Sequence, residues 1–382
     1  MAIEPKKVNL GIPETKTSRG LKVIIAGGGT GGHIFPAIAI ANALVKLDSR
    51  TEILFIGAKG KMEMEKVPQA GYKIEGITIA GFNRSSLIKN IGLPFKLVRS
   101  FFQVRNIFIS YMPDVVIGVG GYSSFPVLRY AQAKGIPSFI HEANSFAGKA
   151  NIMLGKKATK IFVATDGMEK FFPADKIIIS GNPVRESILN SEVSHDEAVS
   201  FFGLRPDRKT VLAIGGSLGA KNINEAIDQH LGMFGQHGIQ LIWQTGKTYV
   251  DRAKELISGK PHVFTSEFIN RMDCAYAAAD IVISRAGAMA IAELCVVNKP
   301  VVFVPYPFAA EDHQTVNAKK LSDQNAALLI PDSEAKEQLV MRVIELIENE
   351  TQQQQMKENL KQFAHLDADV LVAKEILKTV TF

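Results

Sequence analysis

Glycine-rich loops follow three stretches that are expected to be strands, at residues 27–32, 118–121 and 215–216. In parallel sheets, ligands bind beyond the carboxyl ends of the strands. A helix that begins just after such a loop offers free N–H groups and the positive end of its dipole to an anion. One such loop is a turn as readily as a binding site, but their joint placement indicates a ligand cleft between two domains.

The first loop contains the spacing G-x-G-x-x-G, carried by Gly27, Gly29 and Gly32. In dinucleotide-binding proteins, an acidic residue at the end of the second strand holds the ribose. Here the second strand ends in residues 56–59, Ile-Gly-Ala-Lys, and Glu52 lies at its other end. A dinucleotide is therefore disfavoured, a tight structural turn remains an alternative, and we expect no cofactor.

His33 is the candidate general base. It follows the first glycine loop at the expected start of a helix, where the positive end of the dipole disfavours the imidazolium and keeps the ring neutral. A neutral imidazole could take a proton from an attacking hydroxyl. A capping or acceptor-positioning role for His33 is an equally good interpretation, and Glu142 is the alternative base.

A run of mostly small residues, 284–292, follows another apolar stretch and precedes Glu293. Small side chains let a helix N-terminus approach a diphosphate closely. Glu293 lies one to two turns further along, where its carboxylate could hold both hydroxyls of a ribose. On these residues alone, an ordinary helix start with a solvated glutamate is the simpler interpretation.

No metal site is expected. Asp367 and Asp369 form a D-x-D pattern, but they lie in a charged helical tail without a glycine loop, which favours a solvated helix face. Cys274 and Cys295 stand 21 residues apart in apolar surroundings and lack the C-x-x-C spacing of metal sites. Two buried, reduced thiols are the expected state.

Strands and helices alternate along the chain, as expected for parallel sheets covered on both faces. Strands are predicted at residues 22–26, 52–56, 114–118 and 138–140, and again at 210–214, 240–243, 262–264, 280–283 and 300–304. Because the strand and glycine loop at 22–28 recur at 210–216, we predict an α/β protein of two Rossmann-like domains. The predicted parts are a polar lead-in at 1–20, an N-terminal domain at 21–183, a C-terminal domain at 184–365, and a last helix at about 366–382 that packs back on the N-terminal domain.

The 382 residues carry a formal net charge of +6 and a pI near 9.1. This mild excess suits nucleotides, pyrophosphates or anionic lipid without choosing among them. The N-terminus has no apolar run typical of a secretory signal, and no stretch of 18 apolar residues occurs. We therefore expect a protein of the cytosol with no bilayer span.

A basic and apolar segment at residues 76–113 is a candidate membrane face. It holds five basic residues and no acidic one, and its apolar side chains recur at helical spacing near Pro94, which suits a helix start. The residues assigned to this face are Ile91, Phe95, Lys96, Val98, Arg99 and Phe101. Apolar side chains would enter the interface and basic ones would meet anionic headgroups. Packing of the stripe into the N-terminal core is an equally good alternative.

The run Gly28–Ala37, GGTGGHIFPA, resembles the opening motif of the lipid-linked N-acetylglucosaminyltransferases of peptidoglycan synthesis. The similarity continues in the family's order over residues 22–330. It is carried by the motifs at 113–116, 120–123, 141–144, 181–185, 215–220, 285–288, 312–314 and 317–318.

The resemblance implies a GT-B fold, in which two Rossmann-like domains face each other across a cleft. It implies transfer of N-acetylglucosamine from UDP-N-acetylglucosamine to the muramyl 4-hydroxyl of undecaprenyl-pyrophosphoryl-N-acetylmuramyl-pentapeptide, with inversion of the anomeric carbon. It also implies a peripheral place on the cytoplasmic face of the bacterial membrane, against the anionic inner leaflet, because the acceptor's undecaprenyl chain stays in the bilayer. No nucleic acid partner is expected.

The resemblance also assigns roles to residues at matching positions. Ser217 and the backbone of Ala288, Met289 and Ala290 would hold the diphosphate, and Glu293 the ribose. Phe268 and Ile269 would line the uracil pocket, while Asn144 and Gln314 would contact the donor sugar with Arg185 nearby. Thr30, Gly31 and Gly32 would close the cleft, and Gly120, Gly121, Tyr122 and Ser123 would face the acceptor. Ala143 and Leu218 depart from the family, which often has glutamine there, so fine contacts to sugar and phosphate stay open.

Three other classes share parts of this pattern. UDP-N-acetylglucosamine 2-epimerases have the same architecture but need no lipid acceptor, so a basic apolar docking face argues against them. A non-catalytic nucleotide sensor would not need His33 beside a complete donor site. A dehydrogenase would need the ribose-binding acid that the second strand lacks.

Overall fold

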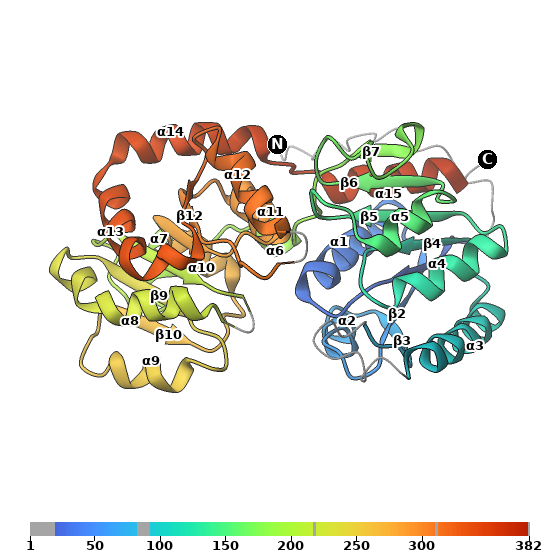
Figure 1. Ribbon diagram of the computed structural model, residues 1–382, viewed down its shortest axis with the longest axis horizontal. Coiled ribbons are helices and arrows are strands. Elements are labelled where there is room, and N and C mark those ends of the chain that lie inside the picture. The colour runs from blue at the N-terminus through green and yellow to red at the C-terminus, as the bar shows by residue number, and fades with distance from the viewer. Residues whose placement is uncertain (1–19, 82–91, 217–218, 310–311, 381–382) are drawn as a thin grey trace, which may run out of the picture.

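The computed structural model describes residues 20–81, 92–216, 219–309 and 312–380. They form two α/β domains side by side, each built on a parallel sheet (Figure 1). The strand order is β3-β2-β1-β4-β5-β6-β7 in the first sheet and β10-β9-β8-β11-β12-β13 in the second. In both sheets the chain starts near the centre and reverses its direction of winding beside the first strand, which creates a topological switch point for ligand binding. The prediction of two Rossmann-like domains is confirmed.

The strands are short apolar segments, as expected for a sheet that is buried on both faces. The N-terminal sheet contains β1 (Lys22–Ala26), β2 (Glu52–Ala58), β3 (Lys73–Ile77), β4 (Val115–Gly118), β5 (Ser138–Glu142), β6 (Lys160–Val163) and β7 (Ile177–Ile179). The C-terminal sheet contains β8 (Thr210–Ile214), β9 (Gln240–Gln244), β10 (Val263–Ser266), β11 (Ile281–Ser284), β12 (Val301–Phe303) and β13 (Leu328–Leu329). Four of these, β3, β6, β7 and β13, were not predicted, and three of the four, β3, β7 and β13, lie at sheet edges.

Helices cover both faces of the N-terminal sheet. They are α1 (Gly31–Leu47), α2 (Glu63–Gln69), α3 (Leu93–Tyr111), α4 (Ser124–Ala133) and α5 (Lys149–Gly155). On one face, α1 packs its buried residues, such as Ile40 and Leu44, against Val23 and Ile25 of β1. On the other face, α3 and α4 pack against Ile24 of the same strand. Successive side chains of β1 point to opposite faces of the sheet, so they are buried alternately in two separate cores.

The C-terminal domain has a single continuous core. Its helices are α6 (Glu186–Leu189), α7 (His195–Phe201), α8 (Lys221–Gln236), α9 (Val250–Leu256), α10 (Met272–Ala278), α11 (Ala288–Val297), α12 (His313–Ser322), α13 (Ala335–Glu348) and α14 (Glu350–Leu360). Trp243 is fully buried there, and its indole N–H donates to the side-chain oxygen of Asn224 at 2.9 Å. This hydrogen bond satisfies the one polar group of a large apolar side chain.

The last helix, α15 (Ala368–Val380), belongs to the N-terminal domain in space (Figure 1). Its residues Val372, Ala373 and Ile376 are buried in the core that also contains β1 and α1. The chain thus crosses between the domains twice, once before α6 and once after α14. Among the described helices, none is both long and apolar enough to cross a bilayer.

Candidate active site

The first turn of α1 and the loop that follows β5 approach the start of α11 where the two domains come together. A Cβ atom placed on Gly32, in the first turn of α1, would lie 3.9 Å from Cγ of Met289 in α11. The side-chain amide of Asn182 connects the two domains, because it donates to the carbonyl oxygen of Ala143 in the N-terminal domain at 3.1 Å and to that of Ala288 in the C-terminal domain at 3.4 Å. The structure therefore brings the predicted cleft residues Gly32, Ala288 and Met289 together.

The glycine loop after β1 is filled by a carboxylate that was not predicted. Glu63, at the start of α2, is only 1% exposed. Its two oxygens accept hydrogen bonds from the backbone N–H groups of Gly29 and Ala58 at 2.8 and 2.9 Å. Because Glu63 already takes the N–H of Gly29, this loop is a poor cradle for a dinucleotide phosphate. Residue pattern alone does not indicate this burial, since a glutamate in the first turn of a helix usually faces solvent.

His33 lies in the first turn of α1 with its Nδ1 atom 3.0 Å from the carbonyl oxygen of Gly28. A carbonyl oxygen only accepts, so Nδ1 carries the proton and Nε2 keeps its lone pair. Nε2 lies against the loop after β4, because a Cβ atom at Gly120 would be 2.8 Å from it. Burial lowers the pKa of His33 from its ordinary value, although Gly28 and the nearby acids Glu142 and Glu63 oppose this shift. His33 is thus a neutral imidazole at neutral pH, as a base requires.

The alternative base, Glu142, is buried and receives four hydrogen bonds. Asn144 donates through its backbone and side-chain nitrogens at 3.1 and 3.3 Å. Gly148 and Asn151 donate to the other oxygen at 3.0 and 2.9 Å. Both oxygens of Glu142 are thus engaged by donors from the protein itself. Glu142 is better placed to shape the loop that carries Asn144 than to act as a base.

The predicted acceptor loop packs directly on the first glycine loop. Gly120 and Gly121 adopt positive φ angles of 94° and 88°, and a Cβ atom at Gly121 would lie 2.4 Å from the carbonyl oxygen of Gly28. Only glycine fits such a close approach. Tyr122 is half exposed, whereas Ser123 is buried and its hydroxyl oxygen has no partner among the described residues. This loop therefore borders the Nε2 side of His33.

Helix α11 provides the candidate diphosphate site. Its N-cap is Gly287 in extended conformation, and the first N–H to find an intrahelical acceptor is that of Ile291, bonded to the Gly287 carbonyl at 3.0 Å. The N–H groups of Ala288, Met289 and Ala290 precede it and have no acceptor within the helix. The small residues of the first turn leave the backbone open to a phosphate. Ser217, the other predicted diphosphate contact, lies outside the described residues.

Glu293 and Arg185 form an ion pair that was not predicted. Nε and Nη2 of Arg185 both donate to Oε1 of Glu293, at 2.9 and 2.8 Å. Oε2 of Glu293 accepts from the hydroxyl of Tyr276 at 3.0 Å. Burial, followed by the nearby carboxylate, raises the pKa of Tyr276 well above its ordinary value, so this tyrosine remains a donor. The carboxylate of Glu293 is therefore buried and hydrogen-bonded by Arg185 and Tyr276, and the alternative interpretation, a solvated glutamate, is wrong.

The other predicted donor contacts of the C-terminal domain lie in the loop after β10 and in α12. Ile269 is buried and gives its N–H to the side-chain oxygen of Gln244 at 2.9 Å, while the carbonyl of Phe268 accepts from Ser266 at 2.9 Å. The N–H of Ile269 and the carbonyl of Phe268 are thus already hydrogen-bonded within the protein, so this backbone offers a uracil fewer free groups than the sequence suggested. Gln314, in the first turn of α12, accepts from the N–H of Tyr306 at 3.0 Å.

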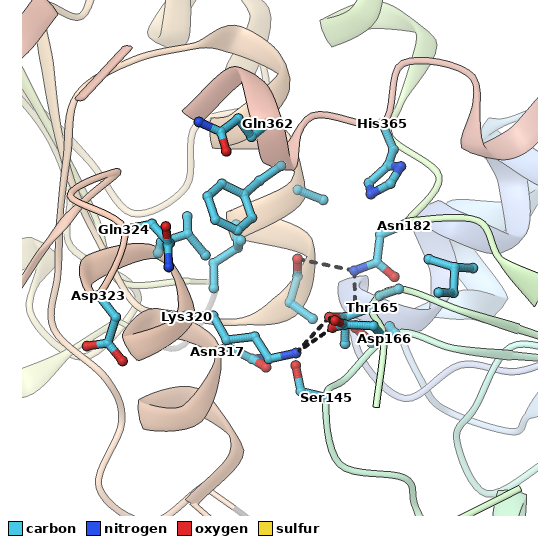
Figure 2. Close-up of a pocket in the computed structure, with 18 residues that line it drawn as sticks. Ser145, Thr165, Asp166, Asn182, Asn317, Lys320, Asp323, Gln324, Gln362 and His365 are labelled. Atoms are coloured by element: carbon cyan, nitrogen blue, oxygen red, sulfur yellow. Dashed lines mark hydrogen bonds and ion pairs between the residues drawn. The ribbon is translucent and has the colours of Figure 1, made fainter. Parts of the chain in front are cut away.

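A cavity of about 650 Å³ lies between the domains and is lined from both sides (Figure 2). Lys320 of α12 reaches across it and donates to the hydroxyl of Thr165 at 2.7 Å and to Asp166 at 3.3 Å (Figure 2). Asn182 and His365, one from each interdomain crossing, also border the cavity. The two interdomain crossings of the chain thus lie beside this cavity.

The predicted membrane face is exposed, with one correction. Phe95 and Val98 of α3 are 79% and 56% exposed, and Lys96 and Arg99 are exposed beside them. Phe101 is half-buried, and Phe102 takes its place at 64% exposure. The remaining member, Ile91, lies outside the described residues.

Helical geometry explains this correction. The buried residues of α3 are Ser100, Val104 and Phe108. Phe101 precedes Val104 by three positions and so shares the buried face, whereas Phe102 follows Phe95 by seven and shares the exposed one. Packing of the whole stripe into the core, the alternative interpretation, is therefore wrong for Phe95 and Val98.

The model of the glycosyltransferase family 28 N-terminal domain matches residues 23–163, and that of the family's C-terminal domain matches residues 210–372. The chain belongs to glycosyltransferase family 28. It is 49% identical over 362 residues to the UDP-N-acetylglucosamine--N-acetylmuramyl-(pentapeptide) pyrophosphoryl-undecaprenol N-acetylglucosamine transferase of Bacteroides fragilis, covering 94% of this chain and 95% of the relative. The enzyme of the same name from Cytophaga hutchinsonii is 46% identical over 369 residues, covering 97% and 99%.

One solved structure agrees with this family assignment, and a second shares the fold. The crystal structure of Acinetobacter baumannii MurG has a TM-score of 0.73 and 28% identity, covering 94% of this family 28 chain and 99% of that one. A UDP-GlcNAc 2-epimerase from Neisseria meningitidis, bound to UDP-GlcNAc, has a TM-score of 0.65 at 15% identity, covering 94% and 100%. The latter likeness shows the fold alone. The predicted GT-B fold and glycosyltransferase activity class are confirmed.

Proposed function

We propose that this glycosyltransferase moves N-acetylglucosamine from UDP-N-acetylglucosamine to the muramyl 4-hydroxyl of undecaprenyl-pyrophosphoryl-N-acetylmuramyl-pentapeptide. The observation that carries the proposal is the near-complete coverage, at 46–49% identity, of relatives named for this transfer. The site geometry supports it, because the first turn of α1, which carries His33, approaches Met289 in the open first turn of α11. The 2-epimerase alternative is less well supported.

In the proposed reaction, Nε2 of His33 takes the proton of the muramyl 4-hydroxyl while that oxygen attacks the anomeric carbon. The bond from this carbon to the β-phosphate oxygen of UDP breaks on the opposite face, so the anomeric centre inverts. The departing diphosphate gains negative charge, and the N–H groups at the start of α11 stabilise it because they are fixed before the reaction. Ser217 adds a further donor in this proposal.

Recognition of the donor falls to the C-terminal domain. Glu293 holds the ribose hydroxyls, with Arg185 beside the sugar, and Phe268 and Ile269 border the uracil. Gln314 and Asn144 contact the N-acetylglucosamine from opposite domains. Thr30, Gly31 and Gly32 close the cleft, and the loop from Gly120 to Ser123 faces the acceptor.

The acceptor's lipid places the enzyme at a membrane. We infer that α3 docks on the anionic inner leaflet at the cytoplasmic face, with Phe95, Val98 and Phe102 in the interface and Lys96 and Arg99 among the headgroups. Its exposed phenylalanines would otherwise remain in water, which is unusual for a patch of this kind.

The test is a transfer assay with UDP-N-acetylglucosamine and the lipid-linked muramyl-pentapeptide in detergent micelles. Mass spectrometry should find the lipid heavier by one N-acetylhexosamine residue, with UDP released in equal amount. A parallel reaction without acceptor should leave the donor intact. Appearance of the 2-epimer in that control, with no change in the lipid, would overturn the proposal and favour the epimerase.

A further inference from the structure

Glu63 differs from the acidic residues around it. It is 1% exposed, whereas the side chain of Glu65, two residues along the same helix, is 67% exposed. Both oxygens of Glu63 accept from backbone N–H groups, those of Gly29 and Ala58. Burying an ionised carboxylate is costly unless it is hydrogen-bonded in this way, so a simple solubilising role does not explain Glu63.

Two glycines make room for this carboxylate. A Cβ atom at Gly28, whose φ is +146°, would lie 2.2 Å from Cδ of Glu63, and one at Gly57 would lie 2.5 Å from its Cγ. The loop after β1 and the end of β2 therefore close around Glu63. Substitution of either glycine would force the carboxylate out of its place.

Gly28 is also the residue that fixes His33. Its carbonyl oxygen accepts from Nδ1 of His33 at 3.0 Å, and its N–H donates to the carbonyl of Gly120 at 3.3 Å. Glu63 thus packs against one side of this peptide segment and the imidazole is bonded to the other. Any movement of Gly28 would change the orientation of the ring and the hydrogen bond that selects its tautomer.

We propose that Glu63 is a positioning residue for His33. Glu63 holds the Gly28 carbonyl in place, so that the imidazole proton of His33 stays on Nδ1. The negative charge of Glu63 also favours the imidazolium that forms on His33 during transfer. This inference rests on the proposed role of His33 as the base. The titratable groups that act on His33 are Glu63 of α2, and Glu142 and His141 of β5. Glu63 acts through Gly28 and does not touch the substrate.

The central comparison is Glu63→Gln against Glu65→Gln in the full-length enzyme. The first replaces a buried acceptor oxygen by an amide nitrogen and removes its charge, and the second makes the same change on the exposed face of α2. We expect Glu63→Gln to lower kcat about 10- to 100-fold, less than the about 10²- to 10⁴-fold assigned to a base itself. UDP affinity should stay within about twofold, because α11 lies in the other domain. Glu65→Gln should match wild type.

The pH profile and the ring tautomer separate positioning from a merely structural role. Without the Glu63 charge, His33 should protonate at lower pH, so the acid limb of kcat should move to lower pH. Nitrogen NMR of histidine-labelled enzyme, with His33→Gln for assignment, should show Nδ1–H in wild type and a mixture of tautomers in Glu63→Gln. Glu63→Asp keeps the charge and should retain the wild-type acid limb even where Glu63→Gln folds poorly.

Distinct outcomes would overturn distinct claims. An unchanged kcat and tautomer in Glu63→Gln, or a loss of UDP affinity as large as the loss of kcat, would refute the positioning role. If His33→Gln remained fully active, the proposed role of His33 as the base would be refuted, whatever Glu63→Gln does. If wild type transferred no sugar, the proposed function would fail, yet the tautomers of wild type and Glu63→Gln would still decide whether Glu63 positions the ring.

Discussion

Arg185 donates two hydrogen bonds, at 2.9 and 2.8 Å, to a single oxygen of Glu293. The guanidinium also lies 4.5 Å from the ring centroid of Phe35, which is on α1 two residues after His33. Arg185 therefore connects the proposed ribose ligand in one domain with the helix of the proposed base in the other. A ribose that competes for Glu293 would weaken this connection, so we expect donor binding to be coupled to the position of α1.

Glu293→Ala should weaken UDP binding about 10- to 150-fold, the range expected for losing a hydrogen bond to a buried ionised group worth roughly 1.5–3 kcal/mol. The substitution also leaves Arg185 and Tyr276 without their shared acceptor, so we expect a lower free energy of unfolding. Glu293→Gln, which can still accept from Tyr276, should lose less stability. Calorimetry with UDP and denaturant unfolding measure the two effects. Unchanged UDP affinity in Glu293→Ala would remove Glu293 from the donor site.

His33→Ala should lower kcat by about 10²- to 10⁴-fold with UDP affinity little changed. The reason is that α1 carries the proposed base, whereas the proposed diphosphate site lies at the start of α11. Steady-state kinetics with the lipid acceptor, paired with calorimetry, provide the test. A decrease of less than tenfold would exclude the base role. Glu142→Gln is the informative companion, because loss of one of its acceptor oxygens should loosen the Asn144 loop and raise the donor KM.

Much of the fold follows from local sequence, because central strands such as β1 and β8 are uninterrupted apolar runs that end in glycine loops. The start of α11 was also visible, since small residues after a strand leave few other interpretations. The family motifs then assigned roles to residues that no periodicity could have selected.

Other features depend on distant partners and could not be predicted in this way. Glu63 resembles any acidic residue at a helix start, and only the loop after β1, some 34 positions earlier in sequence, shows that it is buried. The Arg185–Glu293 pair joins residues 108 positions apart. Phe101 and Phe102 are adjacent and chemically identical, so their difference in exposure depends on which face of α3 meets the sheet.

His141 should make the protein less stable at acidic pH. Burial is the main cause that lowers its pKa from 6.5 to about 4. Between these values the unfolded chain binds a proton that the folded protein does not, so stability falls as pH decreases from about 6.5 to about 4 and is fully present above that window. The loss is on the order of 3 kcal/mol. Urea unfolding of wild type and His141→Asn at pH 7 and 5 tests this, with the half-exposed His195→Gln as control. Equal pH dependence in all three proteins would contradict it.

The exposed face of α3 yields the prediction about membranes, with two contributions that can be separated. Phe95→Ser/Phe102→Ser should remove apolar insertion, and Lys96→Glu/Arg99→Glu should remove attraction to anionic headgroups, at about 1 kcal/mol for each basic residue near the surface. Both pairs should lose co-sedimentation with anionic vesicles while binding UDP as wild type does.

Salt and a control pair make the interpretation specific. Raising the salt concentration should weaken the headgroup contribution and spare the apolar one, so the binding of wild type should fall toward that of the charge-reversed pair. Met341→Ser/Leu366→Ser removes two exposed apolar side chains, 51% and 64% exposed, that lie outside α3, and should leave sedimentation unchanged.

Phe101→Ser should lower stability more than vesicle binding, because that ring lies on the core side of the helix. If neither α3 pair changes sedimentation, the docking surface lies elsewhere on the molecule, and the exposed phenylalanines of α3 need another partner.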